Sequence, residues 1–114
     1  MTKLSQWDVV RVRINPEDRD MHPAVLISRE EVCRDERKAR LNVLYGTTRR
    51  PGDAPDPLEV QLNGADGLER PTLFTCAHIY TVSRRNILQG MGRVTPERRR
   101  QIGRKIAEAF RLPL

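Results

Sequence analysis

The sequence has few of the residue types from which metal centres and disulfide frameworks are built. Its 114 residues include only two cysteines, Cys33 and Cys76, and two histidines, His22 and His78. The cysteines lack Cys-x-x-Cys spacing, and no cluster of histidine and cysteine supplies the four ligands of a structural zinc site. We therefore expect reduced thiols, no metal and no cofactor.

Long hydrophobic runs are also missing. Residues 1–6 hold no apolar stretch of the kind that a secretory signal needs, and nowhere do the roughly twenty apolar residues of a membrane-spanning helix follow one another. The sequence therefore predicts a cytoplasmic protein without a membrane contact. With 38% hydrophobic residues, the chain can close one modest core, whereas two cores would each be too small. We expect a single domain over residues 1–114.

Lysine and acidic residues are scarce beside arginine. Lysine and arginine together number 21 against 15 acidic residues, which gives a net charge of +6, and only Lys3, Lys38 and Lys105 are lysines. A guanidinium group binds phosphate or carboxylate through two parallel hydrogen bonds. The charge favours a polyanionic partner, such as RNA, DNA or an acidic protein segment, and does not choose among them.

Short alternating segments predict a mainly β fold. Val10, Val12 and Ile14 alternate with Arg11 and Arg13, which is the period of a strand with one buried face. Further runs rich in β-forming residues cover 24–28, 41–47, 58–62, 72–76 and 79–82. Five to seven short strands in so short a chain favour a small SH3-like barrel or a strongly bent sheet.

The segments between these strands predict loops and two helices. Residues 15–20 and 49–57 read as loops, the second because its three prolines forbid regular structure. Residues 29–40 read as a charged connector with at most one helical turn. A short helix is predicted from Ser83 through Leu88. A longer, C-terminal helix begins at Thr95, where a capping hydroxyl precedes proline and glutamate.

Two of the predicted strands carry polar groups at neighbouring ends. His22 comes just before the strand at 24–28, and Thr48 follows the strand at 41–47. If these strands are adjacent, an imidazole and a hydroxyl meet at one edge of the sheet. We therefore take His22 and Thr48 as candidates for chemistry.

Several short motifs follow one another in a specific order along nearly the whole chain. They are Asp8-Val9-Val10-Arg11-Val12, Pro23-Ala24-Val25-Leu26-Ile27-Ser28, Val43 to Thr48, Gly67-Leu68 leading to Cys76-Ala77-His78-Ile79-Tyr80-Thr81-Val82, and Gly92-Arg93-Val94-Thr95-Pro96-Glu97. In this order they resemble the PemK/MazF family of toxin-antitoxin ribonucleases, which are small, mostly β, barrel-like domains that end in a helix.

The resemblance implies the toxin of a type II toxin-antitoxin system. Such toxins are homodimers that cut single-stranded mRNA at short sequences without a metal, and an acidic antitoxin silences them by lying along the RNA groove. Metal-free cleavage needs proton transfer and charge stabilisation, which histidine, threonine and arginine supply. The resemblance makes His22 and Thr48 the candidate catalytic residues. The candidate RNA-binding residues are Arg19, Arg49, Arg50 and His78.

Some positions depart from the family's pattern. An arginine usually precedes the proline of the second strand, where this chain has His22. In some members an arginine and an aspartate flank a cysteine of a later strand, whereas Thr75 and Ala77 flank Cys76 here. A second hypothesis is therefore a module that binds RNA or protein without cleavage. Trp7 stands where the family commonly has glycine, and is either a core residue or a platform for a base.

A third hypothesis is a gyrase poison. One fold relative of the family attacks topoisomerase through an aromatic-containing tail. This chain ends in Arg111-Leu112-Pro113-Leu114, without such a tail. The hypothesis therefore ranks below the other two.

Overall fold

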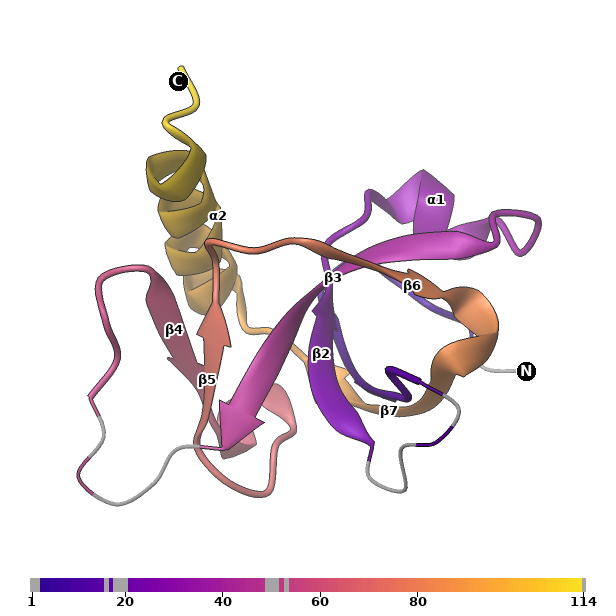
Figure 1. The fold of residues 1–114 in the computed structure, drawn as a ribbon, viewed down its shortest axis with the longest axis horizontal. Coiled ribbons are helices and arrows are strands. Elements are labelled where there is room, and N and C mark those ends of the chain that lie inside the picture. The colour runs from indigo at the N-terminus through magenta and orange to yellow at the C-terminus, as the bar shows by residue number, and fades with distance from the viewer. Residues whose placement is uncertain (1–2, 16, 18–20, 49–51, 53, 114) are drawn as a thin grey trace.

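The computed structural model describes residues 3–15, 17, 21–48, 52 and 54–113. Figure 1 shows a bent sheet with one helix near each end. The elements are, in chain order, β1 (Asp8–Val12), β2 (His22–Leu26), α1 (Glu30–Arg34), β3 (Arg40–Thr48), β4 (Glu59–Leu62), the 3-10 turn η1 (Gly64–Asp66), β5 (Thr72–Thr75), β6 (Tyr80–Ser83), the 3-10 turn η2 (Arg84–Asn86), β7 (Ile87–Arg93) and α2 (Pro96–Phe110).

The seven strands in the described part of the chain belong to one antiparallel sheet in the order β4-β5-β3-β2-β1-β7, and β6 pairs with β3 outside this path. The long strand β3 is the centre of the sheet. One of its edges pairs with β2, and the other pairs first with β6, along residues 40–43, and then with β5, along residues 46–48. The prediction of a mainly β fold with a C-terminal helix is confirmed. The sheet stays open rather than closing into a barrel.

Apolar side chains alternate between the two faces of the sheet and form two cores. Val25 and Leu44 belong to the first core, which Ile102 of α2 completes. Their neighbours Leu26 and Val43 belong to the second core, together with Cys33 of α1. Each helix therefore packs on a different core, and this separation defines two distinct faces for any site at the end of the sheet.

Strand β7 is the element that the sequence did not predict. The prediction of a short helix from Ser83 through Leu88 is wrong. The structure has only the 3-10 turn η2 in this segment, and residues 87–93 then form a strand that pairs with β1. Gly90 and Gly92 give this strand low intrinsic β propensity. Its ladder with β1 also contains two register shifts. The strand therefore depends on its partner, and its own residues carry no alternating pattern.

The loop before α2 is fixed by one buried carboxylate. Asp66 accepts hydrogen bonds from the backbone N–H groups of Asn63, at 3.1 Å, and Thr95, at 3.0 Å. The Arg98 guanidinium lies 3.9 Å from the same carboxylate. These contacts satisfy a buried charge that would otherwise be costly. They join η1 to the start of α2 and so hold the helix against β4, as Figure 1 shows.

Both cysteines are buried, one in each core. Burial raises the pKa of the Cys33 thiol to about 11, and it raises that of Cys76 to the same value. Because only the thiolate is strongly nucleophilic, and both thiols stay protonated near neutral pH, neither cysteine is activated as a nucleophile. Trp7, which the sequence left as core or platform, packs against the first core.

Gly46 lies where the first core leaves no room for a larger side chain, and this close packing can be tested. A Cβ atom at this position would lie 2.6 Å from Cζ of Phe74 and 2.7 Å from Cγ2 of Thr72. We expect Gly46→Ala to lower the free energy of unfolding by about 1–3 kcal/mol, because it overpacks the first core. Gly103 is the matched control, since its Cβ would enter open space on α2. Gly103→Ala should raise stability by about 1 kcal/mol. Urea unfolding measures both, and equal midpoints would contradict the packing argument.

Candidate functional site

The start of β2 and the end of β3 lie at the same end of the sheet (Figure 1). The ladder between these strands pairs Ala24 with Tyr45 and Leu26 with Val43, and it stops at the first of these pairs. Beyond Tyr45, β3 continues alone on this edge while its other edge pairs with β5. His22 and the hydroxyls at the end of β3 therefore lie on neighbouring strands that separate from one another.

Strand alternation decides which hydroxyl shares a face with His22. Ala24 is in the second core and Tyr45 packs against it. Side chains two residues apart in a strand point to the same face, so His22 lies on the second-core face together with Thr47. Thr47 is exposed and His22 is half-buried. The hydroxyl that faces the same way as the imidazole is therefore that of Thr47, which the sequence analysis did not select.

Thr48, the candidate chosen from the sequence, lies on the opposite face. It pairs directly with Thr72 of β5 and has the parity of Leu44, a residue of the first core. Thr48 therefore lies at the strand end that the sequence analysis expected, but on the face opposite to that of His22. The alternation of β3 relative to Leu44 and Tyr45, which belong to different cores, is the structural signal that separates the two threonines.

The other predicted site residues are placed as follows. His78 is exposed in the connection between β5 and β6, and its ring centroid lies 6.4 Å from that of Tyr80. Arg19, Arg49 and Arg50, predicted as RNA-binding residues, lie outside the described residues.

An open cavity of about 490 Å³ is lined in part by Tyr45, whose ring packs against the second core. Tyr45 and Tyr80 stand together at this cavity, with ring centroids 4.6 Å apart and planes tilted by 45°. Tyr45 is two residues from Thr47, which corresponds to about 7 Å along a strand. The complete lining is Arg13, Ile14, Tyr45, Tyr80, Thr81, Val82, Ser83 and Asn86. The sequence analysis missed this group because its members come from two strands, β3 and β6, from the segment that follows β1 and from the turn η2.

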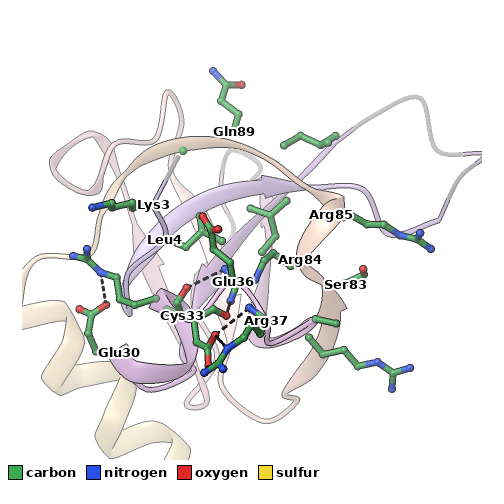
Figure 2. Close-up of a pocket in the computed structure, with 17 residues that line it drawn as sticks. Lys3, Leu4, Glu30, Cys33, Glu36, Arg37, Ser83, Arg84, Arg85 and Gln89 are labelled. Atoms are coloured by element: carbon green, nitrogen blue, oxygen red, sulfur yellow. Dashed lines mark hydrogen bonds and ion pairs between the residues drawn. The ribbon is translucent and has the colours of Figure 1, made fainter. Parts of the chain in front are cut away.

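A larger cavity, of about 1490 Å³, lies between α1 and β7 (Figure 2). Three of its basic side chains make contacts within the protein. Arg34 pairs with Glu30, and Arg37 pairs with Asp35. The Arg84 guanidinium points into the turn after α1, where it donates to backbone carbonyls (Figure 2). None of His22, Thr47 and Thr48 lines either cavity. The smaller cavity is lined by Tyr45, which lies two residues from Thr47 on the same face of β3, so we place the candidate site next to the smaller one.

Among the described residues, no group of three or more histidine, cysteine, aspartate or glutamate side chains is arranged to hold a metal ion. The helices in the described part of the chain are also too short or too polar to cross a membrane.

Comparison with known families identifies the chain. The family model of PemK-like, MazF-like toxins of type II toxin-antitoxin systems matches residues 5–110. The chain belongs to this family. The family resemblance drawn from the sequence motifs is thereby confirmed. No curated protein matches the sequence of this PemK/MazF-like toxin at a significant level.

Several solved structures share the fold of the toxin. An endoribonuclease in complex with its cognate antitoxin, from a mycobacterial species, has a TM-score of 0.79 at 21% identity, with 100% of this chain and 99% of that chain covered. The Mycobacterium tuberculosis toxin MazF-mt6 has a TM-score of 0.75 at 20% identity, with coverages of 94% and 99%. A MazE–MazF structure from Deinococcus radiodurans has a TM-score of 0.76 at 13% identity, with coverages of 99% and 100%.

Proposed function

We propose that this PemK/MazF-like toxin is an endoribonuclease that cuts single-stranded mRNA at short specific sequences without a metal. The observation that carries the proposal is the position of His22 and Thr47 on one face, at the end where β2 and β3 separate. Two relatives of the same fold are described as endoribonucleases. The net charge of +6 suits a polyanionic substrate.

The proposed reaction uses the 2′-hydroxyl of the RNA as its nucleophile. A base removes the hydroxyl proton, the 2′-oxygen bonds to the adjacent phosphorus, and the P–O5′ bond breaks as an acid protonates O5′. We assign one of these two proton transfers to His22, because imidazole can act as a general acid or a general base. The Thr47 hydroxyl donates a hydrogen bond to a non-bridging phosphate oxygen, whose charge grows in the transition state. The products are a 2′,3′-cyclic phosphate and a 5′-hydroxyl.

The proposed partners follow from the same charge and family. We propose that the toxin acts in the cytoplasm as a homodimer and that an acidic antitoxin silences it by occupying the RNA-binding surface. The structures from a mycobacterial species and from Deinococcus radiodurans are of toxins bound to their antitoxins. An acidic segment and RNA would compete for the same arginine side chains, because guanidinium binds carboxylate and phosphate in the same geometry.

One observation favours a second candidate function, a binding module without cleavage. Some family members have an arginine and an aspartate at the positions of Thr75 and Ala77. Here the Ala77 N–H donates to the Thr75 hydroxyl at 3.4 Å, so these positions form a local turn. The acid–base pair of those members is therefore replaced by a structural contact.

A cleavage assay separates the two functions. Purified toxin, free of antitoxin, is incubated with single-stranded RNA of mixed sequence in EDTA. We expect discrete fragments with the wild type and a loss of fragments with His22→Ala, because the proposed chemistry uses protein groups alone. RNA that stays intact but is retained by the protein would overturn the nuclease and establish the binding module.

A further inference from the structure

The Tyr45–Tyr80 pair has the form of a stacking surface at the mouth of a cavity. Tyr45 anchors the pair, because its ring packs against the second core. Tyr80 leans against it and remains 43% exposed, so one face of the pair is open to a ligand. An anchored ring behind an exposed ring forms a rigid platform, and stacking on it costs little conformational freedom.

The groups around this platform match the chemistry of a nucleotide. Arg13 is exposed at the end of β1 and supplies a positive charge for a phosphate. Asn86, Ser83 and Thr81 line the same cavity and carry donors and acceptors of the kind that read a base edge. A volume of about 490 Å³ is within the range of small-molecule sites. Aromatic, cationic and amide groups together are typical of surfaces that bind unpaired bases.

The position of the platform relates it to the candidate catalytic pair. Tyr45 is the partner of Ala24 in the β2–β3 ladder, and Thr47 and His22 each lie two residues beyond this pair on the same face. A strand of RNA with a phosphate at His22 and Thr47 therefore has a base within reach of the tyrosines, given about 7 Å along the strand.

We propose that Tyr45 and Tyr80 form a base-binding subsite, in which one unpaired base of single-stranded RNA, close to the cleaved phosphate, stacks on Tyr80. This subsite rests on the proposed nuclease function and deepens it by naming a determinant of substrate choice. Because single-stranded RNA leaves its bases free to stack and duplex RNA does not, the subsite also accounts for a single-strand requirement.

The test measures binding separately from cleavage. The probes are 5′-labelled, non-cleavable 2′-O-methyl oligonucleotides of the preferred cleavage sequence, or of mixed sequence if no cleavage is found, read by fluorescence anisotropy. A companion set replaces one base at a time by an abasic site. Tyr80→Ala is the test variant, and Tyr80→Phe retains the ring. Ile79→Ala is the matched control, since Ile79 is 41% exposed beside Tyr80 and does not line the cavity.

We expect Tyr80→Ala to weaken binding of the intact oligonucleotide about tenfold or more, as typical for loss of one stacked base. At the one position whose base stacks on Tyr80, an abasic site should weaken binding by the wild type by the same factor. The same abasic site should not weaken binding by Tyr80→Ala any further. Tyr80→Phe and Ile79→Ala should bind like the wild type.

Two results would overturn the subsite. One is wild-type affinity in Tyr80→Ala, and the other is an equal loss at every abasic position, which would indicate a general effect on the surface. If either occurs while the wild type still cuts RNA, the subsite fails and the nuclease stands. If stacking on Tyr80 is found but RNA is never cut, the subsite stands and the nuclease fails.

Discussion

Thr47→Ala is expected to lower the single-turnover rate of RNA cleavage by about 10²–10³-fold, the usual cost of removing one donor to a developing oxyanion. The reason is the alternation of β3, which puts the Thr47 hydroxyl on the face of His22 and puts Thr48 on the face of the first core. Rates are measured with saturating protein and a single-stranded RNA that contains one cleaved site.

Thr48→Ala is the matched control for this prediction. The two threonines are adjacent, both are exposed, and both pair with β5, so alanine should alter folding equally at the two positions. We expect Thr48→Ala to cut RNA at nearly the wild-type rate. The reverse ranking, with Thr48→Ala inactive and Thr47→Ala active, would show that the residue chosen from the sequence carries the chemistry and that the face argument is wrong.

Arg84→Ala is expected to lower the free energy of unfolding by about 3 kcal/mol, which is the upper end of the usual range for a single substitution. The Arg84 guanidinium donates to the carbonyls of Cys33, Val32 and Asp35 at 2.9 Å each, and to that of Lys38 at 2.8 Å. Hydrogen bonds from a charged donor contribute about 1.5–3 kcal/mol each, and solvent recovers part of this when they are lost.

Arg85→Ala is the control for the stability prediction. Arg85 is exposed, lines the same cavity and points away from the turn after α1 (Figure 2). Its removal should change stability by no more than about 0.5 kcal/mol. Urea unfolding followed by circular dichroism compares the two variants. Equal midpoints for Arg84→Ala and Arg85→Ala would mean that the carbonyl contacts of Arg84 do not stabilise α1.

Local sequence patterns predicted the strands and helices that have a clear pattern within their own residues. The alternation of Val10 and Val12 indicated β1, and the capping signal at Thr95 and Pro96 indicated the start of α2. Strand β7 contains Gly90 and Gly92 and is held by pairing with a segment that precedes it by about eighty residues. No local signal indicates such a partner, so residues 87–93 show no pattern from which a strand could be predicted.

The candidate site follows from the sequence only to the level of the strand ends, and its residues stay a prediction. His22 and the threonine pair were found because polar residues end two β-rich runs. Leu44 and Tyr45, however, are both apolar, and without alternation at this point the sequence does not say which of Thr47 and Thr48 faces His22. The partners of Arg84 lie 46 to 52 residues away along the chain, so its role also depends on the fold.

The most direct test of the account is the response of cleavage to a single missing 2′-hydroxyl. In EDTA, an RNA that contains one cleaved site is compared with the same RNA carrying 2′-deoxyribose on the 5′ side of the cleaved bond. The account predicts that the deoxy substrate stays intact and that the all-ribose substrate gives a 2′,3′-cyclic phosphate and a 5′-hydroxyl. Cleavage of the deoxy substrate at the same bond would contradict it.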